Sequence, residues 1–202
     1  MTLTLTPMQQ SALKEAGNIG SGHAANALSQ LLNKKIMISL PTIEICGTSK
    51  IRATFDASKS QFVQICFKLL GDAQGVILFH METATAKNLC SILSDEHAQD
   101  GVEFTNYHIS TLKEIGNILT ASYLNAISHM AGLSLVISVP ELSQNAKDSI
   151  GHIFENTAGA NTEQYAICIK TEFIDLSKKI EAYIVFVPGN ETIFKILKGI
   201  GV

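Results

Sequence analysis

The feature that most constrains the fold of this chain is an internal repeat. Compared with itself at an offset of 99 residues, the sequence matches between segments 11–41 and 110–140 at 13 of 31 positions. The shared residues include Leu-Lys-Glu, Gly-Asn-Ile and a final Pro, in the same order. A fixed offset of this kind indicates duplication of one structural unit. We therefore predict two copies, residues 7–100 and 105–202, related by a pseudo-twofold axis.

The two copies are expected to form one domain, residues 1–202. Their join, residues 94–101, is short and polar, and no Pro-, Gly- or Ser-rich linker separates them. Units of about 100 residues that are joined this tightly bury their apolar faces best against each other. Because the duplication already gives each copy a partner, we expect a monomer.

Composition excludes several classes of protein. Hydrophobic residues make up 46% of the chain, charged residues 16%, and the net charge is −3. A chain this apolar is not disordered, and its charge gives no footprint for nucleic acid. No apolar run reaches the about 20 residues of a membrane span. We expect a cytoplasmic protein, and the absence of a CxxC pair indicates four buried thiols, Cys46, Cys66, Cys90 and Cys168.

Hydrophobic periodicity predicts two long helices, 7–32 and 105–130, the first capped by Thr6 and ended by Asn33. Strands are predicted at 36–46, 51–55, 62–69, 75–81, 133–139, 164–173 and 180–187, and further helices at 82–94, 148–155 and 191–199. Pro41 places the first strand at an edge or a bulge. The order α-β-β-β-α occurs twice, with connections too short for parallel crossovers. The predicted fold class is α+β, a mostly antiparallel sheet with a layer of long helices on one side.

One narrow face of each long helix is polar. On a helical wheel, the first stripe falls within about 60° and consists of Ser11, Glu15, Asn18 and Gly22. The second stripe holds the same positions of the second copy: Ser110, Glu114, Asn117 and Ala121. The residues predicted to face the core on the first helix are Leu13, Ala16, Gly17, Ile19 and Gly20. Both stripes are therefore expected to face solvent.

The residues of the stripes favour a functional role. Asn is a poor helix-interior residue and Gly costs about 0.5–1 kcal/mol relative to Ala, yet Gly17-Asn18 recurs as Gly116-Asn117. A carboxylate can pair with a partner's lysine, and an amide can orient a water molecule. We expect the glycines to let a partner's backbone come close. Such a set suffices for phosphoryl transfer, which depends largely on positioning and charge placement, if the substrate protein supplies the metal.

The doubled pattern Ser-x3-Glu-x2-Asn-x22-Pro resembles the signature of the CheC/CheX/FliY family of chemotaxis phosphatases. It is present as Ser11, Glu15, Asn18 and Pro41, and the same four residue types recur 99 residues later, ending at Pro140. The duplication, the length and the run Leu-Lys-Glu-x-Gly-Asn-Ile-Gly-Ser-Gly are similar to the CheC-type members. The resemblance covers essentially the whole chain.

This resemblance implies an enzyme that hydrolyses the aspartyl phosphate of a CheY-type response regulator. Asn18 and Asn117 would align the attacking water, and Glu15 and Glu114 would pair with the regulator's active-site lysine. The other stripe residues, Ser11, Gly22, Ser110 and Ala121, would belong to the partner interface, and the two prolines would shape the neighbouring strands. The chain would hold no metal or cofactor of its own, because the regulator would supply Mg²⁺. A CheD-like receptor deamidase is a further possible partner.

Two other functions stay open: a non-catalytic module that binds a regulator or a CheD-like deamidase, and a structural switch component. The copies also differ, because Gly20–His23 is replaced by the bulkier Leu119–Ser122, which is expected to alter docking at the second site. Competing motifs are weak. The glycine-rich run lacks the order and the preceding strand of a nucleotide loop, and the six histidines lack metal-ligand spacing.

Overall fold

The computed structural model describes residues 6–56, 61–93, 103–144, 165–175, 178–189 and 191–200. The helices in these ranges are α1 (Pro7–Leu32), α2 (Thr48–Asp56), α3 (Thr83–Leu93), α4 (Asn106–Ala131) and α6 (Thr192–Gly199). The strands are β1 (Met37–Ile38), β2 (Thr42–Gly47), β3 (Phe62–Gly71), β4 (Gly75–Glu82), β5 (Leu135–Ile137), β6 (Glu141–Gln144), β7 (Tyr165–Asp175) and β8 (Lys178–Pro188).

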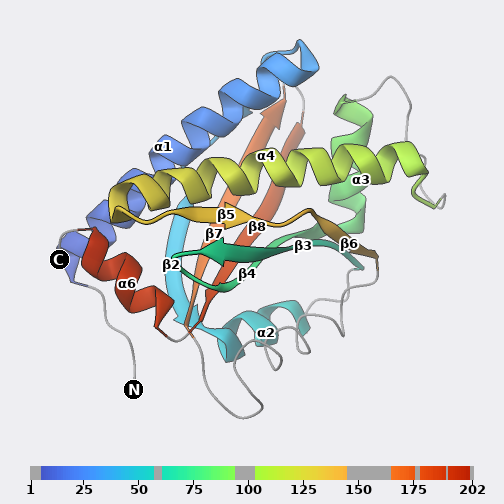
Figure 1. Ribbon diagram of the computed structural model, residues 1–202. Helices are drawn as coiled ribbons and strands as arrows, with labels where there is room; N and C mark the ends of the chain where they lie inside the picture. The colour runs from blue at the N-terminus through green and yellow to red at the C-terminus, as the bar shows by residue number, and fades with distance from the viewer. Residues whose placement is uncertain are drawn as a thin grey trace.

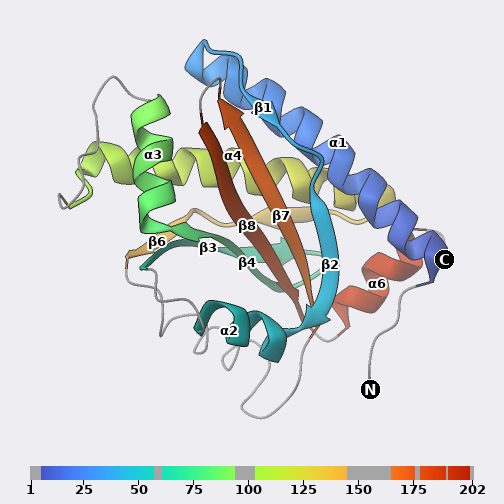
Figure 2. The ribbon, with the colours of Figure 1, turned by 180° about the vertical axis from the view of Figure 1, so that it is seen from behind.

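The strands form one antiparallel sheet to which both copies contribute. Its order is β1-β7-β8-β4-β3-β5, with β2 also pairing with β7 and β6 with β3. The edge strands are thus exchanged: β1 and β2 of the first copy pair with β7 of the second, while β5 and β6 pair with β3 of the first. The central pair is β4–β8, one strand from each copy. The predicted α+β class, antiparallel sheet and pseudo-twofold arrangement are confirmed (Figures 1 and 2).

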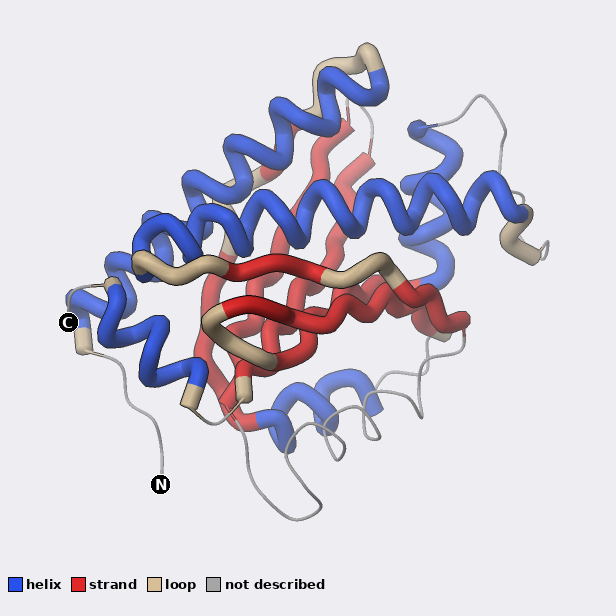
Figure 3. Tube along the Cα trace, in the orientation of Figure 1, coloured by secondary structure: helices blue, strands red, loops and turns tan. Residues whose placement is uncertain are grey.

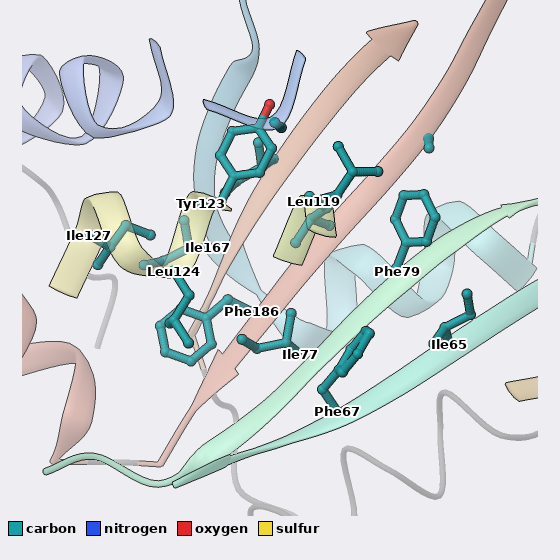
Figure 4. Close-up of a cluster of buried hydrophobic side chains, with 14 of the residues drawn as sticks. Ile65, Phe67, Ile77, Phe79, Leu119, Tyr123, Leu124, Ile127, Ile167 and Phe186 are labelled. Atoms are coloured by element: carbon teal, nitrogen blue, oxygen red, sulfur yellow. The ribbon is translucent and has the colours of Figure 1, made fainter. Parts of the chain in front are cut away.

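The two long helices lie side by side on one face of this sheet, and α2 lies on the other (Figures 1, 2 and 3). The main core fills the space between the helices and the sheet. Figure 4 shows Leu119 and Tyr123 of α4 among sheet side chains such as Phe79, and all three are at most 2% exposed. The predicted helical layer therefore rests on one continuous apolar core.

Both long helices begin and end at strong local signals. Thr6 and Thr105 are N-caps, and each forms a capping box, with Gln9 and His108 respectively. The C-cap of α1 is Asn33, at φ 48°, and that of α4 is Gly132, at φ 64°. Both are residues that tolerate the left-handed conformation. The helix 7–32 was predicted with its observed bounds, and α4 begins and ends one residue later than predicted.

Several predicted elements differ from the structure. Residues 51–55 are not a strand but lie in α2, where Ile51 is buried while Arg52 and Ala53 are exposed. The strand 36–46 is divided at Pro41 into β1 and β2, and the strand after α4 is short and followed by an unpredicted β6. Residues 148–155, predicted as a helix, lie outside the described residues.

Two sequence-based expectations concern the chain as a whole. None of the four cysteines, all within the described ranges, forms a disulfide, but the prediction that all are buried is wrong: Cys90 is buried and the other three are half-buried. Burial raises the pKa of the Cys66 thiol to about 11 and those of Cys90 and Cys168 to about 12. Among the described helices, none has the length and hydropathy needed to span a membrane.

Candidate functional site

The first stripe lies on the outward face of α1. Ser11, Glu15, Asn18 and Gly22 are all exposed, whereas Leu13 and Ala16 on the opposite face are 3% and 2% exposed. One residue of the wheel was misplaced: Ile19 was expected in the core but is 38% exposed. It lies at the margin of the buried face, next to Asn18. The carboxylate of Glu15 and the amide of Asn18, three residues apart, therefore share an accessible surface.

The second stripe lies on α4 and is less open. Ser110 and Glu114 are exposed, while Asn117 and Ala121 are half-buried. The cause is the position of the helix. Besides α1, it contacts α3, α6, β4, β5 and β6, whereas α1 contacts only α4, β1 and β2 to a comparable extent among the described elements. The structure thus brings the same four positions together twice, with the second amide more constrained than the first.

The glutamate and asparagine side chains of the two stripes are available for binding. Within the described ranges, the side chains of Glu15, Asn18, Glu114 and Asn117 make no hydrogen bond or ion pair with another residue. The Ser21 hydroxyl donates a hydrogen bond of 2.9 Å to the backbone carbonyl of Asn18, and this bond does not involve the side-chain amide. Each site therefore offers one carboxylate and one amide whose hydrogen-bonding groups can engage a partner.

The glycines that precede the asparagines face inward, which corrects their expected role. A Cβ on Gly17 would overlap the Ile43 side chain and lie 3.1 Å from Cγ of Pro41. A Cβ on Gly116 would lie 3.0 Å from Cδ1 of Ile65 and 3.2 Å from Cδ1 of Phe79. Both glycines are buried. They let each helix approach the sheet closely, rather than giving access to a partner's backbone.

The difference between Gly20–His23 and Leu119–Ser122 is also largely internal. Leu119 and Thr120 are 0% and 1% exposed, so their bulk lies in the core and not on a docking surface. Gly20 faces α4, where an added Cβ would lie 2.9 Å from Cα of Tyr123. At the surface, the change is limited to Gly22→Ala121 and His23→Ser122. Gly22 has open space around it, so the expected difference in docking from this stretch is small.

Each motif proline interrupts an edge strand beside its helix. Pro41 separates β1 from β2, and Pro140 separates β5 from β6, as expected for a residue that cannot donate to a ladder. The Pro41 ring packs against α1 at Gly17, immediately before Asn18. The predicted placement of this proline at a sheet edge is confirmed.

The stripes extend further than the sequence analysis recognised. Met8 and Tyr107 lie one turn before Ser11 and Ser110, at the same position of the repeat, and are 63% and 53% exposed. The available signal was the wheel itself, since a residue seven positions before the glutamate shares its face.

As for metal ligands, no group of three or more His, Cys, Asp or Glu residues in the described ranges could hold an ion.

The antiparallel sheet with its layer of long helices has the fold of the FliY and CheX structures. FliY of Thermotoga maritima has a TM-score of 0.75, with 20% identity over 98% of both chains. A CheX–CheY–BeF3–Mg²⁺ complex from Borrelia burgdorferi has a TM-score of 0.52, with 19% identity over 86% of this chain and 98% of that chain.

Residues 8–45 and 108–143, one segment in each copy, match the model of the CheC-like family. The resemblance seen in the sequence is thereby confirmed. A curated relative, the CheY-P phosphatase CheC of Bacillus subtilis, is 29% identical over 199 residues, which cover 96% of this chain and 94% of that protein.

Proposed function

We propose that this protein hydrolyses the aspartyl phosphate of a CheY-type response regulator. The relatives named above support a CheY-P phosphatase, since CheC carries that name and CheX forms a complex with CheY. The observation that carries the proposal for this chain is the accessible Glu/Asn pair, present once on each long helix with no internal hydrogen-bond partner in the described ranges.

The mechanism assigns one role to each side chain. The amide of Asn18 or Asn117 enters the regulator's phosphorylation site and holds a water molecule in line with the acyl phosphate. The water oxygen forms a bond to phosphorus, the bond between phosphorus and the aspartyl oxygen breaks, and the aspartate leaves as a carboxylate. Inorganic phosphate retains one proton of the water, and the other passes to solvent.

The glutamate fixes the docking geometry. An exposed carboxylate three residues from the asparagine can form a charge-assisted hydrogen bond with the regulator's active-site lysine. The Mg²⁺ that neutralises the phosphoryl oxygens belongs to the regulator in this proposal, so the chain's own residues contribute position and not charge neutralisation. We also propose that the protein works as a cytoplasmic monomer, because each copy already completes the other's sheet.

The test follows the decay of a ³²P-labelled regulator with the wild-type protein and with Asn18→Ala/Asn117→Ala. Loss of both water-orienting amides is expected to lower the phosphatase rate by about 100-fold or more. The matched control is Gln30→Ala/His129→Ala, which truncates exposed side chains at repeat-related positions of the same helices, twelve residues or about 18 Å beyond the motif asparagines. The control should retain the wild-type rate.

Two outcomes contradict the proposal. Equal rates for wild type and the motif variant would show that the amides do not position water. A protein that binds the regulator without accelerating decay would instead be the non-catalytic module. Glu15→Gln/Glu114→Gln should mainly weaken regulator binding, because it removes the charge of the carboxylates and preserves their shape.

A further inference from the structure

Each stripe begins with a large exposed apolar side chain. Met8 is 63% exposed and Tyr107 is 53% exposed, although both belong to helices that bury their other face in the core. Each lies seven residues before the glutamate of its own stripe, which is two helical turns along the same face. Single exposed hydrophobic residues are common on proteins. A matched pair at one repeat position, each in line with a functional stripe, is a more specific feature.

A second matched pair lies beside the stripes. Leu40 and Val139 are 77% and 80% exposed, the highest exposures among the large hydrophobic residues of the described ranges. They too share one repeat position, directly before Pro41 and Pro140. Leu40 directly precedes Pro41, whose ring packs on α1 at Gly17, so Leu40 is placed beside the helix that carries the first stripe. Val139 lies between β5 and β6, two strands that contact α4, and β5 runs along this helix in Figure 1.

Exposing these four apolar side chains to water does not stabilise the folded chain, whereas burying them against a bound partner would stabilise the complex. We propose that Met8 and Leu40 in the first copy, and Tyr107 and Val139 in the second, are the apolar anchors on which a phosphorylated receiver domain docks. The inference rests on the proposed function and adds the partner contacts to it. The Glu/Asn pair supplies the polar centre of each interface, and the anchors supply apolar contacts on either side.

The dimensions fit a single receiver domain at each stripe. Met8 and Asn18 are ten residues apart on one helix, or about 15 Å along its axis. One side of a standard interface covers about 800 Å², roughly 30 Å across. One domain centred on the asparagine therefore reaches the anchor at the start of the stripe and the one beside it. The partner surface that fits has a polar, phosphate-holding pocket with apolar side chains around it.

The anchors also differ between the copies. Tyr is enriched among residues that dominate binding energies, because it combines a large contact area with few rotatable bonds, and Met is more flexible. Val139 is smaller than Leu40. The two stripes share their catalytic chemistry, and the anchors are the positions at which they would differ in affinity or in the choice of regulator.

The experiment measures kcat and KM for dephosphorylation with the wild type and with Met8→Ala/Leu40→Ala/Tyr107→Ala/Val139→Ala. We expect KM to rise by about 10-fold or more, with kcat within about 2-fold, because the anchors contact the partner away from the reacting atoms. The control is Leu31→Ala/Phe194→Ala, which removes two hydrophobic residues of similar exposure, 52% and 61%, outside both stripes. This control should keep the wild-type KM.

The outcomes separate this inference from the proposed function. An active wild type whose KM is unchanged in the anchor variant would overturn the inference and leave the phosphatase function intact. A wild type without activity would overturn the proposed function. In that case, binding of the regulator activated with beryllium fluoride and Mg²⁺ decides: weaker binding to the anchor variant supports the anchors, and equal binding refutes them. Circular dichroism of each variant checks that it is folded.

Discussion

The two copies of the repeat carry the same motif on helices of the same length, yet they use those helices differently. In α4, eleven of 26 residues are buried, and in α1 seven of 26 are buried. The second helix is enclosed by α3, α6 and strands of both copies, whereas the first lies toward one side of the sheet (Figure 1). Duplication has therefore kept the outward chemistry while the inward faces have diverged, so that α4 forms the centre of the helical layer.

The divergence is complementary where the helices meet. At the position where α1 has Gly20, α4 has Leu119, and where α1 has Ala24, α4 has Tyr123. Tyr123 fills the space beside Gly20, and its hydroxyl donates a hydrogen bond of 3.3 Å to Oγ1 of Thr171 in the sheet. Small residues on one helix thus accommodate large residues on the other. The following predictions test how far the two copies differ, from the largest expected effect to the smallest.

Leu119→Ala should produce the largest change. Leu119 is 0% exposed in the main core, so its truncation leaves a cavity beneath α4 and is expected to lower the free energy of unfolding by about 3 kcal/mol. Ala24→Gly, at a position of α1 that is also 0% exposed, removes one methyl group and should cost about 1 kcal/mol. Urea unfolding measures both. Equal effects would show that the helical layer does not depend on α4 more than on α1.

His80 should make stability depend on pH through the first copy. Burial lowers the pKa of this histidine in β4 to about 4, whereas the unfolded value is near 6.5. The unfolded chain therefore binds a proton below pH 6.5 that the folded chain rejects until about pH 4. Stability should fall across this window, by about 2 kcal/mol between pH 7 and pH 5.

Strand β8 of the second copy, which pairs with β4, contains no histidine. The control for the pH prediction is therefore His80→Leu, which removes the histidine of the β4–β8 pair. Urea unfolding at pH 7, 6 and 5 should show a shallower loss of stability in this variant. A slope as steep as that of the wild type would assign the effect to other groups.

Single asparagine variants should reveal unequal sites. Asn117 is half-buried on α4, the helix with more contacts, so its amide has fewer orientations to lose when it positions water. The second copy also carries the Tyr107 anchor. We expect Asn117→Ala to lower the phosphatase rate by about 5-fold, or about 1 kcal/mol, and Asn18→Ala by less than about 2-fold. Decay of the phosphorylated regulator measures both. A larger effect of Asn18→Ala would show that the exposure of the asparagine matters more for the rate than the restriction of its side chain.

The helix caps should give the smallest effects. The boxes of Thr6 and Thr105 have similar geometry, with side-chain oxygens 3.2 Å from the nitrogens of Gln9 and His108. The box of α4 is partly buried and that of α1 is exposed. Thr105→Ala is expected to cost about 1 kcal/mol and Thr6→Ala about 0.5 kcal/mol. Thermal unfolding compares them, and Thr→Ser variants, which keep the capping oxygen, should stay near the wild type.

Much of the fold could be predicted because local signals were strong. Thr6, Pro7 and Asn33 determine the bounds of α1, and the repeat transfers them to α4. The segment 51–55 was mispredicted because Ile51, Ala53 and Phe55 alternate with polar residues by chance, and the buried Ile51 alone does not reveal a helical period. The strand β6 was missed because Glu141–Gln144 is short and polar, as suits an edge.

The exposed faces of the site could be predicted more reliably than its surroundings. The wheel placed Glu15 and Asn18 outward because helical periodicity fixes direction relative to the buried face. It also placed Gly17 inward, but it could not reveal the contact of Gly17 with Pro41 and Ile43, since that contact is made by a strand segment whose position is set by tertiary pairing. For the same reason the exchange of edge strands was beyond local reasoning: alternation reveals a strand's two faces and not its neighbour.

This exchange has a consequence for how the chain is made. During synthesis, β1 and β2 leave the ribosome early, but the strand they must join, β7, follows only when most of the polypeptide has been translated. Until then their backbone donors and acceptors stay open to other chains. Pro41, which interrupts this segment, and the acidic Glu44 within it would deter such encounters in the meantime. The sheet can close only near the end of translation, which makes the nascent first half a natural client for molecular chaperones.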